Sequence, residues 1–417
     1  MSSDLRRMHH VSLHVSNVDK ITNDLVSKFK FHLIATRLTD RSRQLAFRTG
    51  SVIFIINERG RNQSSGNPAV LEDDDALSQQ TGCLYDISPE YPLDTACNVC
   101  LEVEDVHGWF HALQRLGCSF LVPPTAVRDQ QGQVTYAVLK SVLGNLCHTL
   151  IDKTKYKGSF LPGFNLVDEN PGTSGDDGLV THMDHIALAC PIGMSPQVMS
   201  WYGQVLGFQK YFINSNDNMD DGFVINQSGK GLRLAAMQYS KCSETGLAVS
   251  CEDKHEPDCK FVVVESMPGE GRNQVDTFLE EHGGAGIQHI GLHTSDIVSA
   301  THTMMDAGAS FFLQPAAYYA QREKQQAIVD AGYDPQKLYQ CGILLDTDPE
   351  EDLLASSQAR KYLLQVFTQP LFEEDTFFLE LIERRGVIGF GDGNIRALWD
   401  CVQMYVDNRK DAPEADQ

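Results

Sequence analysis

The sequence contains one strand-and-helix unit four times, arranged as two tandem pairs. The stretch MHHVSLHVSNVDKITNDLVSKFKF from Met8 matches MDHIALACPIGMSPQVMSWYGQVLGF from Met183. The stretch NVCLEVEDVHGWFHALQRLGCSFLVPP from Asn98 likewise matches HIGLHTSDIVSATHTMMDAGASFFLQP from His289. Each stretch opens with the alternation of a strand and continues with the spacing of an amphipathic helix. Because a repeat of this length determines architecture, the chain is predicted to fold as two similar halves.

Signals inside the units indicate where their elements begin and end. An Asp stands near the start of the helices, where a carboxylate caps exposed backbone N–H groups. The helices of the second matched pair end at Gly117 and Gly308, the usual left-handed stop. Further strands follow, such as QLAFRTGSVIFIIN and GLRLAAMQY. The pattern predicts an α+β fold of two tandem domains that resemble vicinal-oxygen-chelate domains, each a curled sheet built from two βαβββ modules.

Composition shifts place the domain boundaries. Residues 1–155 are predicted to form the first domain and residues 181–408 the second, catalytic domain, with a C-terminal helix that closes its site. Between them lies 156–180, YKGSFLPGFNLVDENPGTSGDDGLV, a stretch rich in Gly, Pro and Asp without periodicity, which is typical of a linker. The acidic tail at 409–417 is predicted to be disordered.

The overall charge narrows the class of partner. The chain has 34 basic and 56 acidic residues, a formal charge of −22, which argues against a nucleic-acid or anionic-membrane surface. We expect a small molecule or a second copy of the chain as partner. No apolar run approaches the roughly 20 residues that span a bilayer, and no secretory signal is visible. An integral membrane segment is therefore not expected.

The eleven cysteines are an odd number, which suits free thiols in a reducing compartment. Cys97 and Cys100 form a CNVC motif within a strand, where residues three apart point to opposite faces, so we expect no zinc site there. The loop stretch with Cys251, His255 and Cys259 could hold a metal, although an acidic surface insertion is the plainer interpretation.

Comparing the two halves identifies candidate metal ligands. In the second half, two opening strands present His185 and His289, and the last long strand presents Glu380. The matching positions of the first half are His10, Asn98 and Thr149, of which a single residue is a good transition-metal ligand. The second half is therefore predicted to carry the chemistry, and the first half is predicted to be a degenerate, structural copy.

Strand alternation supports these ligands. His185 shares a face with Ala187, and His289 shares a face with Gly291, so small neighbours leave room beside each imidazole. A glutamate in the middle of the apolar FFLELI is costly to bury unless a cation neutralises it. Two imidazoles and one carboxylate form the facial triad that suits non-haem Fe(II) and O2 chemistry. His293, further along the same strand face, is expected to be an ordinary polar residue.

Three motifs make the sequence recognisable. GGAGIQHIGLHTSDI, KYLLQVFTQP and FFLELIERRGVIGFGDGNIRALWD resemble the 4-hydroxyphenylpyruvate dioxygenase family, and the resemblance covers nearly the whole chain. It is closest to the metazoan branch of dioxygenase-like proteins and points to the 4-hydroxymandelate synthase type. The resemblance implies that Fe(2+) is the cofactor and that His185, His289 and Glu380 bind it.

The resemblance also implies residues near the substrate. These are Gln274, Gln288, Gln365, Phe390 and Asn394. Gln365 and Phe367 share a strand face, whereas Gln288 should point away from the face of His289 and act on the metal through its ligand. GFGDGN then leads into a helix that closes over the site in the family, with an apolar stripe of Ile395, Leu398, Trp399, Val402 and Val406.

The implied reaction is the oxidative decarboxylation of 4-hydroxyphenylpyruvate with O2, releasing CO2. The product is either homogentisate or 4-hydroxymandelate. Ile395 stands where homogentisate-forming enzymes have a Phe, and FVVVES runs into MPGEGRNQ without the family's Pro-Ile-Asn-Glu-Pro segment. Both departures alter the ring side of the pocket, so 4-hydroxymandelate is the predicted product. The resemblance further implies a mitochondrial location, with the cytoplasm as alternative, a role in ubiquinone head-group synthesis, and a homodimer.

Three alternatives stay open at this point. A homogentisate-forming enzyme of tyrosine catabolism shares every predicted ligand. A non-catalytic binding protein could have kept the fold. Another metalloenzyme on the same fold, such as a ring-cleaving dioxygenase or a glyoxalase, is disfavoured by LLQVF and GFGDGN.

Overall fold

The structure is a computed structural model of the 417-residue chain. It describes residues 5–40, 42–59, 83–87, 89, 92–167, 178–211, 222–227, 230–239, 260–269, 273–347, 361–374, 376–387, 389–391 and 393–397. Several sequence predictions fall outside these residues. They are the stretch with Cys251, His255 and Cys259, the acidic tail, and the positions Leu398, Trp399, Val402 and Val406.

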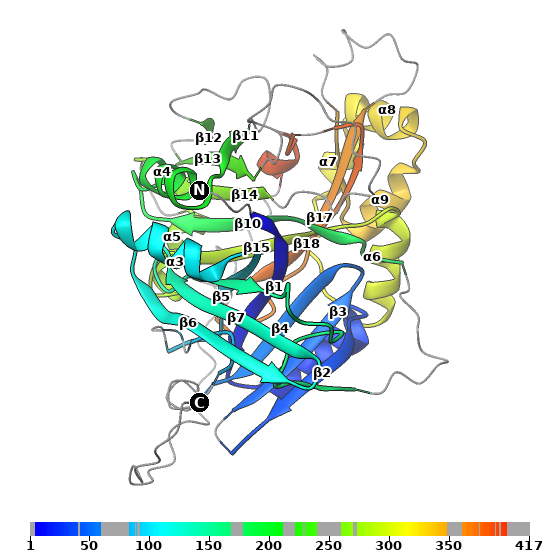
Figure 1. Cartoon of the computed structure of the whole chain (residues 1–417). Helices are drawn as coiled ribbons and strands as arrows, with labels where there is room; N and C mark the ends of the chain where they lie inside the picture. Colours follow the sequence, from blue (N-terminus) through cyan, green and yellow to red (C-terminus); the bar gives the residue numbers. More distant parts are fainter. Residues whose placement is uncertain are drawn as a thin grey trace, which may run out of the picture.

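Each half of the chain forms a nine-stranded sheet (Figure 1). The first sheet has the order β6-β7-β8-β5-β1-β4-β3-β2-β9. Its strands are β1 (Leu5–Val15), β2 (His32–Leu38), β3 (Arg43–Thr49), β4 (Val52–Glu58), β5 (Thr95–Val103), β6 (Phe120–Asp129), β7 (Gly132–Lys140), β8 (Cys147–Asp152) and β9 (Asn165–Leu166).

The second sheet has the order β11-β13-β14-β10-β15-β18-β17-β16, with β12 paired to β13. Its strands are β10 (His182–Cys190), β11 (Gln209–Tyr211), β12 (Phe223–Gln227), β13 (Lys230–Gln238), β14 (Lys260–Ser266), β15 (Gly286–His293), β16 (Leu344–Asp346), β17 (Tyr362–Phe367) and β18 (Phe378–Arg385).

The strand pairing shows the predicted repeat of four βαβββ modules. Each module's first strand pairs in parallel with its last strand, as in β1 with β4, β5 with β8, β10 with β14, and β15 with β18. The two modules of a half join through their first strands, which run antiparallel in β1–β5 and in β10–β15. The α+β prediction with two curled, tandem sheets is therefore confirmed.

The helices lie between the strands of each module. They are α1 (Val18–Asn23), the π-helical η1 (Asp24–Lys28), α3 (Val106–Arg115), α4 (Ser195–Leu206), α5 (Gln274–Glu281), α6 (Ile297–Asp306), α7 (Ala316–Ala320), α8 (Arg322–Asp330) and α9 (Pro335–Cys341). α3 and α6 begin alike, because Asp105 and Asp296 accept hydrogen bonds from backbone N–H groups of the first turn. The insertion α7 to α9, which packs beside α6 and β16, breaks the repeat and was not predicted.

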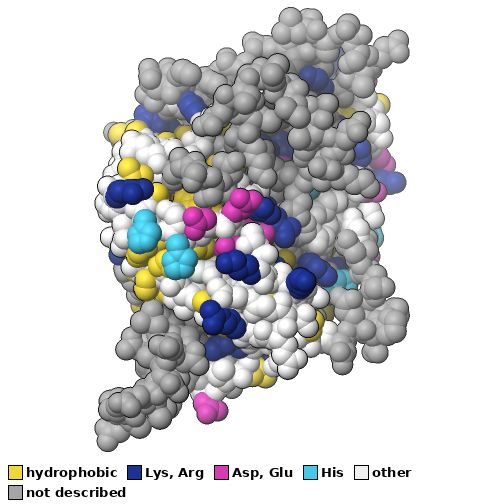
Figure 2. Space-filling view, viewed as in Figure 1, with side chains coloured by type: hydrophobic (Ala, Val, Ile, Leu, Met, Phe, Trp, Pro, Cys, Tyr) yellow, Lys and Arg dark blue, Asp and Glu magenta, His cyan; other side chains and the backbone are white. Residues whose placement is uncertain are grey.

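The predicted linker partly belongs to the first sheet. Within 156–180, the strand β9 pairs with the edge strand β2, so this segment extends the first sheet. The linker's residues 168–177 lie outside the described part of the chain. Among the described residues, no helix has the length and apolar character needed to cross a membrane. On the described part of the face in Figure 2, acidic, basic and apolar side chains lie interspersed.

The two halves pack on each other through their central strands. β5 of the first sheet contacts β15 of the second, and Figure 1 shows these strands side by side. Thr95 Oγ1 lies 2.8 Å from His282 Nε2, and His148 Nε2 lies 2.9 Å from the hydroxyl of Tyr202, all buried. One hydrophobic cluster draws residues from both halves. The first sheet therefore packs directly against the central strand β15 of the second sheet.

Candidate metal centre

Three neighbouring strands bring the predicted ligands together. His185 lies on β10, His289 on β15 and Glu380 on β18. His185 Nε2 is 3.4 Å from His289 Nε2 and 3.2 Å from Glu380 Oε2, and His289 Nε2 is 3.5 Å from the same oxygen. His185 and Glu380 are almost completely buried, and His289 is slightly exposed. Such a spacing lets one cation contact all three donor atoms.

The pairing of the strands explains this convergence. His185 lies opposite Gly291 across β10–β15, and Gly291 pairs with Glu380 across β15–β18. Gly291 therefore stands between the imidazole and the carboxylate. A Cβ atom at this position would lie 2.3 Å from Cε1 of His185, so the ring extends over the glycine to reach Glu380. The prediction that small neighbours leave room at the centre is borne out at this position.

A β-bulge precedes each of the two histidines. Asp184 is the extra residue between the pairs of Met183 and His185, and Gln288 is the extra residue between Ile287 and His289. Asp184 Oδ1 accepts a hydrogen bond from His185 Nδ1 at 2.9 Å, and Gln288 Oε1 lies 3.3 Å from His289 Nδ1. Alternation predicted that Gln288 points away from His289, but the bulge brings the two side chains into contact. Each contact leaves Nε2 directed at the centre.

Glu380 is held by a second chain of hydrogen bonds. Gln365 Nε2 donates to Glu380 Oε1 at 2.8 Å, and Asn394 Nδ2 donates to Gln365 Oε1 at 2.9 Å. Asn394 is completely buried and donates also to the backbone oxygen of Leu363. Gln365 and Phe367 share a face of β17, and Phe367 pairs directly with Glu380. These contacts fix one carboxylate oxygen and leave Oε2 toward the histidines.

The pKa shifts reflect the close packing of these groups. Burial alone would lower the pKa of His185, but Glu380 and Asp184 outweigh it and raise the pKa to about 9. The pKa of His289 lies well below its usual value, because its ring is buried and His185 lies beside it. Two buried carboxylates beside His185 therefore favour positive charge at this position, which a divalent ion can supply.

Apolar side chains wall the space around the three donors. On one side Phe390 and Ile395 pack in a cluster with Val262, Val264 and Phe278. On the other side Ala397 packs in a cluster with Phe312, Leu344, Phe367 and Phe378. Residues 393–397 are helical, so the first turn of the predicted C-terminal helix joins the two walls. The Phe378 ring stacks on His289 at 4.7 Å between centroids.

Asp184 and Arg384 belong to the site but were not among the predicted residues. Arg384 donates to both carboxylate oxygens of Asp184, at 2.7 and 2.8 Å, and lies 5.1 Å from the ring of Phe390. The sequence offered a signal, since an Asp directly before a strand His and an Arg on a buried strand both need partners. Gln274, the half-buried first residue of α5, has no contact with the three donors among those described.

Known proteins resemble the chain over most of its length. It is 40% identical to the 4-hydroxyphenylpyruvate dioxygenase-like protein of Mus musculus over 407 residues, which cover 97% of this chain and 98% of the mouse protein. The chain belongs to the 4-hydroxyphenylpyruvate dioxygenase family. The 4-hydroxyphenylpyruvate dioxygenase of Dictyostelium discoideum is 28% identical over 320 residues, or 76% of this chain and 79% of that one. No family model matches.

A solved structure shows the same fold for this member of the dioxygenase family. A variant of 4-hydroxymandelate synthase from Streptomyces coelicolor superposes with a TM-score of 0.71 at 21% identity, covering 97% of this chain and 99% of that chain. The vicinal-oxygen-chelate architecture predicted from the repeat therefore extends over both halves.

The first half of this family member has the same strand register without the ligands. Asn98 lies opposite Ser12 as His289 lies opposite Ala187, and Thr149 pairs with Cys100 as Glu380 pairs with Gly291. The matched positions inferred from the sequence, His10, Asn98 and Thr149, are thus structurally equivalent to the three candidate ligands. The residue opposite His10 is Cys100.

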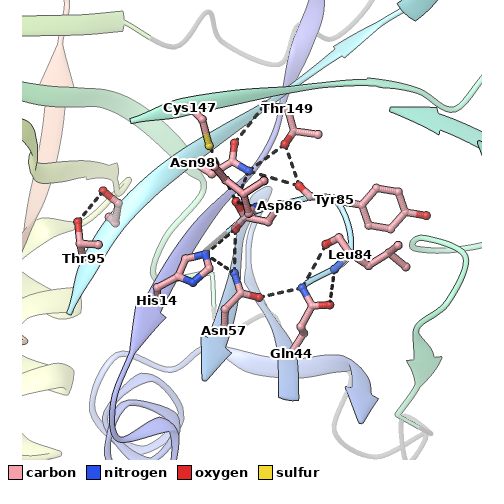
Figure 3. A network of polar contacts seen from close by, with 12 residues as sticks. His14, Gln44, Asn57, Leu84, Tyr85, Asp86, Thr95, Asn98, Cys147 and Thr149 are labelled. Carbon is pink, nitrogen blue, oxygen red and sulfur yellow. Dashed lines mark hydrogen bonds and ion pairs between the residues drawn. The ribbon is translucent and has the colours of Figure 1, made fainter. Parts of the chain in front are cut away.

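A loop of the first half places Asp86 beside the matched positions Asn98 and Thr149 (Figure 3). Asp86, buried at the centre of the network, accepts hydrogen bonds from Asn57 Nδ2 at 2.8 Å and Asn98 Nδ2 at 2.7 Å, and lies 2.8 Å from His14 Nε2. Asn98 also donates to Thr149 Oγ1. His9, His10 and Cys100 form a second group of potential donors, but the Nδ1 atoms of His9 and His10 lie 2.8 Å apart, a hydrogen-bond distance.

Proposed function

We propose that the chain is an Fe(II)-dependent dioxygenase that converts 4-hydroxyphenylpyruvate and O2 to 4-hydroxymandelate and CO2. The observation that carries this proposal is the spacing of His185, His289 and Glu380 among apolar side chains. Two imidazoles and one carboxylate on one side of an ion leave about three positions for other ligands. The dioxygenase family supports the reaction class, and the fold is shared with a 4-hydroxymandelate synthase.

The donor set fits Fe(II), which when bound would chelate a 2-oxo acid and activate O2. The protein supplies three things around it. Asp184 and Gln288 hold the imidazoles so that Nε2 faces the centre. Gln365 holds Oε1 of Glu380, which leaves Oε2 for the metal. Phe390 and Phe378 pack against the imidazoles and exclude water from the reacting groups.

The ring side of the hollow supports the choice of product. Ile395, which stands where homogentisate-forming relatives are expected to have a Phe, packs against an apolar cluster with Phe390. An aliphatic side chain there supplies no aromatic face on which the substrate ring could stack. We therefore favour oxidation of the benzylic carbon over attack on the ring. Homogentisate formation is the alternative on the same centre.

Product analysis tests the proposal. Protein loaded with Fe(II) is incubated with 4-hydroxyphenylpyruvate and O2, and the products are identified by mass spectrometry. We expect 4-hydroxymandelate and CO2 as products. Homogentisate as the main product would contradict the choice of product, and an iron-loaded protein without O2 uptake would favour a binding protein.

Paired variants test whether Glu380 holds the metal. Glu380→Ala removes one of three donors and is expected to reduce iron content and O2 uptake at least ~100-fold. Thr149→Ala changes the matched position of the first half, so it controls for lost stability and should keep both. Equal iron content in the two variants would reject the metal centre.

A mitochondrial location, a role in ubiquinone head-group synthesis and a homodimer stay predictions. Organelle fractionation and light scattering test the first and the last. Deletion of the gene followed by measurement of ubiquinone tests the second.

A further inference from the structure

Arg384 connects two parts of the centre that belong to different elements. Its side chain, on β18 four residues beyond Glu380, is largely buried and binds both oxygens of Asp184. It also donates to the backbone oxygen of Gly389 and lies over the ring of Phe390. The same guanidinium therefore contacts the carboxylate behind His185 and the segment that leads into the C-terminal helix.

At Asp184 the guanidinium sets the position of the carboxylate that holds a metal ligand. Asp184 is almost completely buried, and a buried carboxylate is stable where donors satisfy both of its oxygens. Two charge-assisted bonds from Arg384 hold both carboxylate oxygens in place. Asp184 Oδ1 consequently keeps the Nδ1–H of His185 and leaves Nε2 as the donor atom.

At Phe390 the guanidinium sets the position of an aromatic wall. The ring of Phe390 lies between two partners, the guanidinium at 5.1 Å and the edge-on imidazole of His185 at 5.0 Å between centroids. Gly389, directly before it, is held by its backbone oxygen. Displacement of Gly389 and Phe390 from these positions would break both contacts of Arg384.

We propose that the buried Arg384–Asp184 pair couples the orientation of the metal ligand His185 to the position of Gly389 and Phe390. This positioning role rests on the metal function proposed above and goes beyond it, because it links metal binding to the placement of the aromatic wall. The link is reciprocal: a metal that fixes His185 stabilises the position of Phe390, and a fixed Phe390 strengthens metal binding.

Two measurements on each variant test the coupling. Co²⁺, a spectroscopic substitute for iron, is titrated by its visible absorption, and hydrogen exchange is followed in the peptide spanning Gly389 to Ala397. In the wild type, bound Co²⁺ should slow exchange in this peptide. Arg384→Gln should weaken Co²⁺ binding about 10- to 100-fold and abolish the slowing. Arg384→Lys keeps the charge without the paired bonds and should fall between.

A variant of the next residue, Arg385, provides the matched control. Arg385 is half-exposed and pairs with Glu383 at 2.7 Å, away from the centre, so Arg385→Gln should leave both measurements unchanged. The double variant Asp184→Asn with Arg384→Gln removes both buried charges together and guards against misfolding of the single variant. It should fold, bind Co²⁺ weakly and show no slowing.

Two outcomes separate the coupling from the metal function. If the wild type binds Co²⁺ in a manner that depends on Glu380 while Arg384→Gln behaves like Arg385→Gln, the coupling is wrong and the metal centre stands. If Glu380→Ala binds Co²⁺ as well as the wild type, the metal centre itself is wrong.

Discussion

The two halves of the chain place a histidine at the same point of the same strand register and give it opposite properties. His10 in the first half and His185 in the second are both completely enclosed. Burial lowers the pKa of His10 to about 3, with Asp86 offsetting a part. His185 is equally buried, but Glu380 and Asp184 raise its pKa to about 9. The fold alone therefore does not make a metal ligand.

The difference lies in what surrounds each imidazole. In the second half two carboxylates, those of Asp184 and Glu380, face His185. Oε2 of Glu380 lies 3.2 Å from His185 Nε2 and 3.5 Å from His289 Nε2. In the first half Asp86 accepts hydrogen bonds from Asn57 and Asn98, whereas His10 Nε2 is buried without a hydrogen-bond partner among the described residues. A metal centre therefore requires carboxylates that converge on the imidazole, as they do in the second half.

The largest expected effect comes from copying one residue of the first half into the second. Gly291→Cys places the residue found at Cys100 opposite His185. Its Cβ would lie 2.3 Å from the imidazole Cε1, so the ring must turn away from Glu380. We expect metal binding at least ~100-fold weaker, measured by Co²⁺ titration.

The reciprocal exchange is the control for this variant. Cys100→Gly opens the same position in the first half, where His10 has no carboxylate at the matched site. Its metal content should equal that of the wild type. Full metal binding by Gly291→Cys would show that the register does not decide where His185 points.

Sequence reasoning recovered the features that the repeat carries. The four modules, the two joined sheets and the meeting of His185, His289 and Glu380 follow from strand alternation and from the match between the halves, because both depend on local periodicity. Asn98 and Thr149 occupy the positions equivalent to His289 and Glu380, and this equivalence follows in the same way.

The structure adds features that depend on irregular backbone. A bulge shifts alternation by one residue, so the contacts of Asp184 and Gln288 with the histidines contradict a strict period of two. The loop that carries Asp86 has no counterpart in the repeat, and nothing in its sequence shows that the carboxylate lies beside Asn98. Arg384 pairs with Asp184, which lies 200 residues away in the chain, and composition does not reveal this pairing.

An intermediate effect is expected when the buried carboxylate of Asp86 in the first half loses its charge. Asp86→Asn replaces an acceptor by an amide that would face the Nδ2 groups of Asn57 and Asn98. Buried donors without acceptors should lower the free energy of unfolding by about 3 kcal/mol, measured by urea unfolding.

Co²⁺ binding by the same variant tests whether the first half takes part in metal binding. Asp86→Asn should bind Co²⁺ as the wild type does, since Asp86 lies in the structural copy. Asp19→Asn, which removes the exposed carboxylate of an ion pair with Arg43, is the matched control and should leave the free energy of unfolding nearly unchanged. Loss of Co²⁺ binding at unchanged stability would mean that the first half takes part in the metal chemistry.

The smallest expected effect is a change in acid sensitivity that arises from His10. Its folded pKa of about 3 lies below the ordinary value of 6.5, so the unfolded chain takes up the proton first as pH falls. The stability that His10 contributes is complete above pH 6.5 and is lost as pH falls toward 3, by about 1.4 kcal/mol per pH unit. His10→Gln should reduce this slope in urea unfolding between about pH 6 and pH 5. Ser12→Ala, a buried neighbour on the same strand face that does not titrate, should keep it, and equal slopes in both variants would show that His10 is not held neutral by burial.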